Sequence, residues 1–138
     1  MKWVKRIMIW FTLLFIVTYF VFALWASFLV NSLVNSSYKN HGKYDEKLEK
    51  VISEDLYGFL DYSNGYYEHE EPYEESCKQS FPITYHFFFA ATVTYKYSYL
   101  RTATNSGEIL SGSSKVPVTV RLVFKDWHWK VVKISEAP

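Results

Sequence analysis

The feature of this sequence that most constrains the fold is a long apolar run near the N-terminus. The run extends from Ile7 to Val30, and no charged residue occurs between Arg6 and Lys39. An α-helix of about 20 predominantly apolar residues crosses the hydrocarbon core of a bilayer. The run meets that length, and nothing on such a helix is polar enough to face water. We therefore predict a transmembrane helix over residues 7–30, with the lipid bilayer contacted through Ile7 to Val30.

The charges on either side of the run predict its orientation. Lys2, Lys5 and Arg6 precede it directly, whereas the first cation after it is Lys39. Positive residues stay on the cytoplasmic side of a membrane. We expect a single-pass protein of the cell membrane, with residues 1–6 in the cytoplasm and an extracytoplasmic C-terminal domain.

A cleaved signal peptide is the alternative interpretation of the run. Its apolar region would be about 7–15 residues long and would end at small residues. The run is longer, and in "ALWAS" Leu24 stands where a small residue is needed. These features favour an uncleaved anchor.

Composition limits what the rest of the chain can be. A chain of 138 residues has room for one modest domain. The net charge of +1 excludes the strong basicity that favours nucleic acid, so no nucleic-acid partner is expected. Aromatic residues make up 20% of the chain, which favours β-structure beyond the run. The single Cys77 cannot form an internal disulfide.

After the run, residues 31–43 are rich in Asn and Ser and predict a polar linker. The period then changes to three and four residues, which indicates an amphipathic helix that starts at Tyr44 and stops near Gly65. Its apolar positions are Tyr44, Leu48, Val51, Ile52, Leu56, Phe59 and Leu60. An extracytoplasmic α+β domain is therefore predicted over residues 44–138.

The acidic stretch that follows has the composition of a metal site but not its spacing. His69 lies among glutamates that include Glu68, Glu70 and Glu71. Carboxylates and a His can ligate calcium or a transition metal. No second His is nearby and no Asp-rich loop has a Gly at its turn, so we expect a solvated acidic segment and no metal or cofactor.

From Phe81 onward the period is two, which is typical of strands. The odd positions from Ile83 to Tyr99 are apolar and predict one long strand that bends at Ala90–Ala91. Turn residues follow at 104–108, and a second strand is predicted over Val116–Lys125. The residues "KDWH" form a turn, and Trp129 begins the last strand. The predicted fold class is α+β, with an N-terminal transmembrane helix followed by one amphipathic helix packed on an antiparallel sheet of at least three strands.

The helix followed by strands that end in "VPVTVRLVFKDWHWKVVKISEAP" resembles a small nuclear-transport-factor-two-like (cystatin-like) α+β domain. The resemblance covers Tyr44 to Pro138 and departs from the family in having one clear helix and in carrying "DWH" at the turn. It implies a cone of sheet and helices around a possible pocket, which both enzymes and scaffolds of this family use. Single-span proteins with such an external domain occur in bacterial conjugation and secretion assemblies, which favours a scaffold role in an envelope complex.

Enzymes of the family use an Asp with a His or Tyr in the cone, and the positions that match are His86, His128 and Asp61. No nucleophile elbow, phosphate loop or paired carboxylates accompany them. We therefore expect a binding or assembly module with no catalytic residues. A small-molecule-binding domain or an enzyme that uses His86 and Asp61 is the alternative.

Two surfaces are candidates for a protein partner or for self-association. One is the polar face of the sheet, which carries Lys96 and Arg121. The other is the acidic segment, where Tyr66, Tyr67 and Tyr73 are amphipathic contact residues among charges. Packing of these tyrosines within their own loop is the competing interpretation.

Overall fold

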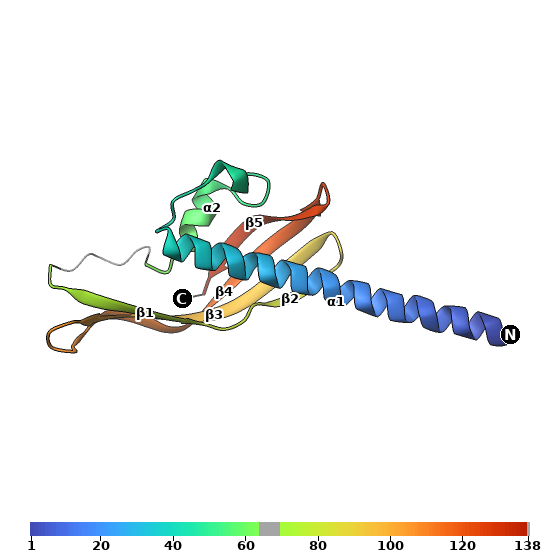
Figure 1. The fold of residues 1–138 in the computed structure, drawn as a ribbon, viewed down its shortest axis with the longest axis horizontal. Helices are drawn as coiled ribbons and strands as arrows, with labels where there is room; N and C mark the ends of the chain where they lie inside the picture. The colour runs from blue at the N-terminus through green and yellow to red at the C-terminus, as the bar shows by residue number, and fades with distance from the viewer. Residues whose placement is uncertain (64–69, 138) are drawn as a thin grey trace.

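The computed structural model describes residues 1–63 and 70–137. The fold is α+β: a long N-terminal helix, a short second helix and a five-stranded antiparallel sheet. Helix α1 (Lys2–Lys39) runs for 38 residues, and only its C-terminal half lies on the sheet (Figure 1). Its N-terminal half extends beyond the rest of the molecule, and residues 3–17 are all exposed. Within the described residues, α1 is the helix that is long and apolar enough to cross a membrane.

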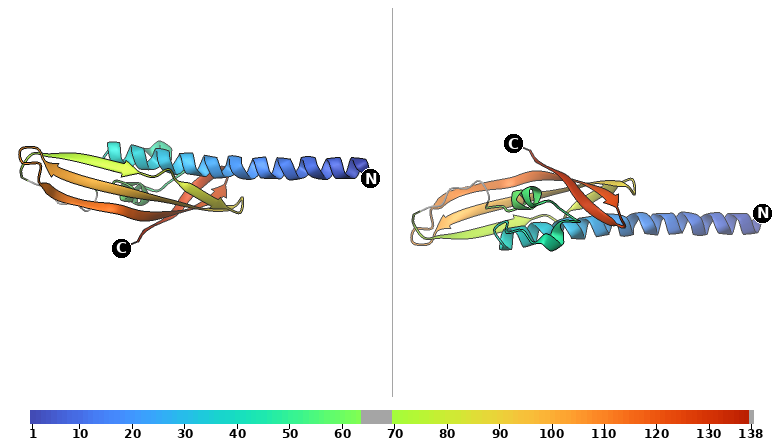
Figure 2. Two further views of the ribbon diagram at one scale, coloured as in Figure 1. Left: turned by 90° about the horizontal axis from the view of Figure 1, so that it is seen from below. Right: turned by 90° about the horizontal axis from the view of Figure 1, so that it is seen from above.

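The sheet is built around the long central strands β3 (Ala90–Ala103) and β4 (Ile109–Lys125). Strand β5 (His128–Glu136) pairs with β4. The other edge of β3 is shared by β2 (Ile83–His86) near its beginning and β1 (Tyr73–Gln79) near its end. The strands run lengthwise beside α1, as both views in Figure 2 show.

The sheet therefore has two different ends. The proximal end lies beside the middle of α1 and holds the β2–β3 turn, residues 87–89, and the β4–β5 turn, residues 126–127. The distal end holds the β3–β4 turn, residues 104–108. We call the face that α1 covers the inner face and the opposite one the outer face.

The linker predicted over residues 31–43 is wrong for residues 31–39, which continue α1. Some of the Asn and Ser residues there are exposed and others are packed. Residues spaced three and four apart form a stripe that faces the sheet. This stripe is fully buried and consists of Ala26, Ser27, Val30, Leu33, Val34 and Ser37. The helix ends where Gly42 adopts a φ of +73° and its N–H bonds to the carbonyl of Ser37 at 2.8 Å.

The predicted second helix is present, but it is much shorter than its predicted extent from Tyr44 to near Gly65, because the chain forms two short helical pieces there. A 3₁₀ turn covers Glu46–Leu48 and α2 covers Glu54–Phe59. Between them the backbone pairs with the sheet, since Val131 N–H donates to the carbonyl of Val51 at 2.7 Å. That bond holds the connecting residues and buries Ile52 completely.

The predicted inner faces of β3, β4 and β5 are confirmed over most of their length. Val93, Tyr95 and Val120 are buried, as are Trp129 and Val131. The prediction of one long strand from Ile83 is wrong in its first part, because the chain reverses at residues 87–89 and forms the separate strand β2. In β2 the even-numbered side chains, not the odd-numbered ones, face the inner side. His86 consequently lies inside, whereas Ile83, Tyr85, Phe87 and Phe89 are exposed. Strand β1 is a further difference, since an irregular segment is predicted there.

Candidate functional site

The inner face is filled with side chains, which leaves little room for a ligand between α1 and the sheet. Trp129, Tyr57 and Tyr99 are the largest fully buried residues of this core. A cavity near the end of α2 touches Asp61, Tyr62 and Glu136, and its volume is ≈ 60 Å³. Ligand pockets are typically about 300–1,000 Å³, so this space suits water rather than a substrate.

Asp61, one of the two candidate catalytic residues, closes a turn. Its side chain is 8% exposed, and its Oδ1 accepts hydrogen bonds from the N–H and the hydroxyl of Ser63, at 3.0 Å and 2.7 Å. Local bonds of this kind are typical of Asp after a helix. The carboxylate therefore has a structural partner in its own loop.

His86, the other candidate, fastens the β2–β3 turn to α1. Its ring stacks on Tyr19, with 3.9 Å between the ring centroids. Its Nδ1 accepts the N–H of Phe88 at 3.1 Å, so its Nε2 carries the proton and donates to the carbonyl of Tyr19 at 2.7 Å. Both ring nitrogens thus hold backbone groups.

The structure does not bring His86 and Asp61 together. His86 lies against Tyr19 of α1, whereas Asp61 adjoins Tyr62, whose ring packs on Tyr38 of α1. Tyr19 and Tyr38 are separated by about 28 Å along a helix with a rise of about 1.5 Å per residue. His128 is not near Asp61 either, because it begins β5, whereas Asp61 lies beside Glu136 at the other end of that strand. The Nε2 of His128 bonds instead to the carbonyl of Lys50 at 2.8 Å.

A buried charged cluster near the distal end is built around Arg101, Glu75 and Tyr99, which are absent from the predicted site residues. Arg101 is 4% exposed, and its Nε donates to Glu75 at 3.2 Å and to the hydroxyl of Tyr99 at 2.7 Å. The guanidinium also lies over the ring of Tyr73, 4.8 Å from its centroid. Burial, together with Glu75, raises the pKa of Tyr38 to about 12. The signal in the sequence is that Arg101 continues the odd-numbered inner positions of β3 after Tyr99.

The predicted interaction residues lie on different faces of the sheet. Tyr73 belongs to the inner face with Arg101, whereas Lys96 and Arg121 point outward. Tyr66 and Tyr67 lie outside the described residues. The two predicted surfaces are therefore not continuous through Tyr73.

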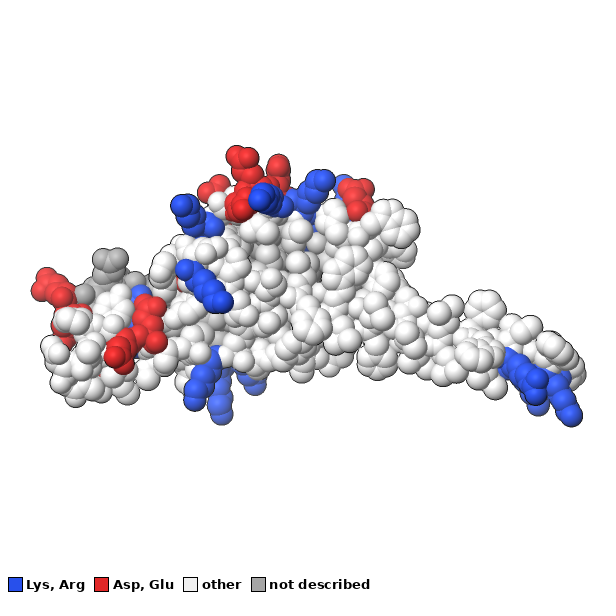
Figure 3. All heavy atoms as spheres, viewed as in Figure 1, with Lys and Arg blue, Asp and Glu red and all other residues white. Residues whose placement is uncertain are grey.

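The outer face carries several basic side chains, and no helix in the part of the chain that the structure describes covers it (Figure 1). Arg121 pairs with Thr92 on one side and Lys133 on the other, so it lies at the centre of the face, and both cations are exposed. We use the name basic face for the part of this surface formed by five exposed cations, which are Lys78, Lys96, Arg121, Lys130 and Lys133. In the described part of the chain no salt bridge engages any of them, and Glu74 shares the face only near the distal end. Figure 3 shows basic side chains that project from the side of the sheet opposite α2.

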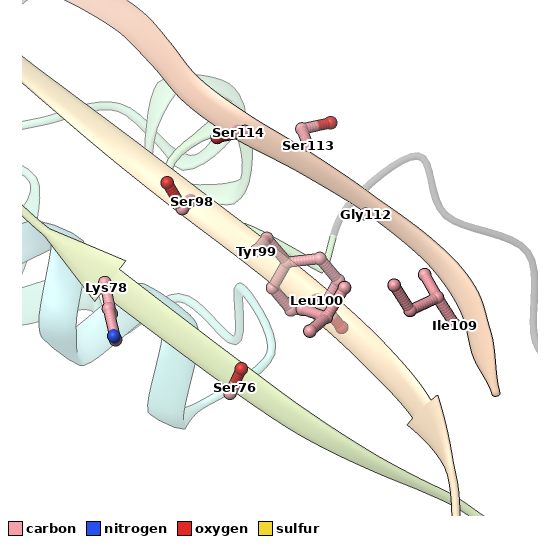
Figure 4. Close-up of a pocket in the computed structure, with 9 residues that line it drawn as sticks. All are labelled: Ser76, Lys78, Ser98, Tyr99, Leu100, Ile109, Gly112, Ser113 and Ser114. Atoms are coloured by element: carbon pink, nitrogen blue, oxygen red, sulfur yellow. The ribbon is translucent and has the colours of Figure 1, made fainter. Parts of the chain in front are cut away.

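A shallow groove of ≈ 480 Å³ crosses the outer face toward the distal end. Figure 4 shows Leu100 and Ile109 beside it, with hydroxyls from Ser76 and Ser98. Gly112 forms part of its floor, and a Cβ there would lie 2.5 Å from the carbonyl oxygen of Tyr99. Glycine is therefore required at this position, which pairs with Leu100 between the two register shifts of β4 against β3.

Comparisons with protein-family models, with curated proteins and with solved structures found no match for this chain. The resemblance to nuclear-transport-factor-two-like domains stays a prediction.

Proposed function

We propose that this protein is a single-pass anchor of the cell membrane whose external domain binds an acidic protein partner through the basic face. It acts as an assembly module, a scaffold component of an envelope complex. The observation that carries the proposal is that one face of the sheet is open and basic, and no acidic side chain among residues 1–63 and 70–137 forms a salt bridge with its cations.

The anchor is supported by the exposed half of α1. Residues 3–17 are all exposed, with Phe15 in ring contact with Phe88 of the domain, and they are apolar apart from Lys5, Arg6 and Thr12. The hydroxyl of Thr12 donates back to the carbonyl of Met8 at 2.9 Å, so it needs no water. The cations at the N-terminus favour a cytoplasmic location for that end.

A protein partner is favoured over a small ligand because of the shape of both faces. The inner face is filled, and the outer one is broad, with a shallow groove rather than a deep pocket. Complementary charge increases the rate and the specificity of protein association. Two copies of this chain placed face to face would bring like charges together, so we propose a different, acidic partner.

Charge reversal on the basic face tests this function. The double variant Lys96→Glu and Arg121→Glu should abolish cross-links between the full-length protein and its partner in intact membranes. Lys43→Glu with Lys47→Glu is the matched control, because these exposed cations lie on the α2 side of the molecule. Unchanged cross-links in the first variant, or equal loss in both, would contradict the proposal.

A further inference from the structure

We propose that the proximal end of the domain is inserted into the outer leaflet of the same bilayer that α1 crosses. The inserted surface, here called the aromatic tip, consists of Phe87, Phe88 and Phe89 in the β2–β3 turn and Trp127 in the β4–β5 turn. This inference rests on the proposed membrane anchoring and is independent of the proposed partner.

The aromatic tip is unusual for turns in water. Phe87 is 85% exposed, Phe89 77% and Trp127 88%. The distal turn, by contrast, contains Thr104, Asn105, Ser106, Gly107 and Glu108, which is ordinary turn chemistry. The two ends of one sheet therefore match different surroundings. Contiguous exposed apolar patches mark interaction sites for protein or membrane.

The length of α1 puts the aromatic tip at the depth of the membrane. A hydrocarbon core of about 30 Å corresponds to about 20 helical residues. A core that starts at Ile7, just after the cations, then ends near Ala26. The ring of Phe88 packs on Phe15, at 5.5 Å between centroids, and on Phe22, at 5.7 Å. Both contacts fall within that core.

The exposed part of α1 alone is too short to span the core. Residues 3–17 cover about 21 Å, so the next turns of the helix must also lie in lipid. Those turns are apolar on the side that the domain leaves uncovered, where Phe20, Val21 and Leu24 are exposed. The helix is thus covered by the aromatic tip on one side and suited to lipid on the other at the same level.

The backbone of the β2–β3 turn is suited to a medium without water. The N–H of Phe87 bonds to the carbonyl of Ala90 at 2.9 Å, and that of Phe89 to the carbonyl of Phe87 at 2.7 Å. The N–H of Phe88 bonds to His86 at 3.1 Å. Unsatisfied backbone groups are costly in lipid, and these three donors are satisfied within the protein.

Backbone conformation adds a further argument. Phe88 has a φ of +62°, and Asp126 and Trp127 have φ values of +52° and +65°. Such conformations favour Gly or Asn, and a two-residue hairpin with positive φ at both positions prefers Asn-Gly. Phe88 and Trp127 are bulky aromatic residues that occupy two of these three positions despite the cost, which indicates a role for their side chains.

The charges beside Trp127 limit how deeply each turn inserts. Lys125 and Asp126 are exposed, so the β4–β5 turn belongs in the headgroup layer, where Trp is enriched. The β2–β3 turn has no charged residue between His86 and Lys96 and extends to the level of Phe15. Phe87 and Phe89 therefore enter the acyl chains.

Spin labels in the full-length protein test the depth of insertion. In a Cys77→Ala background, single labels are introduced by Phe87→Cys, Trp127→Cys, Ile109→Cys and Phe11→Cys, and the protein is placed in nanodiscs of phosphatidylcholine and phosphatidylglycerol. Collision with oxygen reports lipid, and collision with a water-soluble nickel chelate reports solvent. Ile109 is the matched control, because it is an exposed apolar residue near the distal end.

We expect oxygen to dominate at positions 11 and 87, nickel to dominate at position 109, and position 127 to lie between these extremes. A label at position 87 that is as accessible to nickel as the one at position 109, while position 11 remains in lipid, would overturn the inserted tip and leave the anchor intact. Nickel access at position 11 would overturn both. Phe89→Cys reports on the same turn if Phe87→Cys fails to fold.

Discussion

At the residue scale, polar residues of the core hold elements of the domain together. His86, a candidate for catalysis in the alternative function, has such a structural role. His86 uses both ring nitrogens to hold backbone groups of the β2–β3 turn and α1. Tyr57 is fully buried, and its carbonyl accepts the hydroxyl of Ser37 at 2.6 Å. Polar groups in this core stabilise contacts between elements that lie far apart in the sequence.

The first prediction concerns His86. His86→Ala should lower the free energy of unfolding by about 1–3 kcal/mol, because it leaves the N–H of Phe88 without its partner and removes the ring stacked on Tyr19. His41→Asn is the matched control, since His41 is exposed and Asn tolerates its φ of 53°. Chemical denaturation of the full-length protein in nanodiscs measures both. Equal stability of both variants and the parent would show that His86 has no such role.

The second prediction concerns alkaline pH. Burial raises the pKa of the Cys77 thiol to about 11, and burial raises the pKa values of Tyr62, Tyr95 and Tyr99 as well. The folded state therefore keeps protons that the unfolded state releases, so the stabilisation is complete below the unfolded pKa values and is lost as pH rises through the folded ones. Stability should fall from about pH 9 upward. Tyrosinate absorbance followed together with circular dichroism tests this, and ionisation of all tyrosines without unfolding would contradict it.

At the element scale, the sequence predicts the helices and strands whose residue pattern depends on neighbours in the sequence. It does not predict those that depend on contacts with distant residues. The faces of β4 and β5 follow from alternation alone, and Val118, Val120 and Leu122 are buried as predicted. The continuation of α1 could not be predicted in this way. Its buried stripe includes Ser27 and Ser37, which suit a helix only because the sheet and Tyr57 meet them. The position of β2 depends on a turn at three phenylalanines, where no usual turn residue marks it.

The third prediction follows from α1 as the cover of the sheet. Leu33→Ala should destabilise the domain by about 2–5 kcal/mol, because it removes a buried side chain and leaves a cavity. Asn35→Ala, an exposed position of the same helix, should have little effect. Thermal unfolding of the domain compares the two variants. Similar melting temperatures would mean that the helix is not an essential part of the core.

At the scale of the whole molecule, the two ends of the sheet are chemically distinct. The proximal end holds Phe87, Phe89 and Trp127, and the distal turn holds Thr104 to Glu108. The candidate functional surface lies between them on the outer face. The sequence predicts that its basic residues occupy polar positions of the sheet. That these cations form no salt bridges among the described residues could be seen only from the fold.

The fourth prediction concerns topology. Protease added to intact protoplasts should digest the domain and leave a short fragment in the membrane, because the N-terminal cations favour a cytoplasmic end. Protoplasts permeabilised with detergent are the control for cleavage of any protected chain. Survival of the full-length protein in intact cells would reverse the proposed orientation, and a domain released without protease would mean that the anchor is cleaved.

Helix α1 runs without a break from Lys2 to Lys39 and contains no Gly or Pro at which it would bend. There is consequently no joint between the exposed half of the helix and the domain. The two parts therefore move as one rigid body. A lateral force on the distal end exerts a torque on the N-terminal half of the helix. A partner that pulled on the basic face would therefore tilt the whole anchor, rather than swivel a domain on a tether.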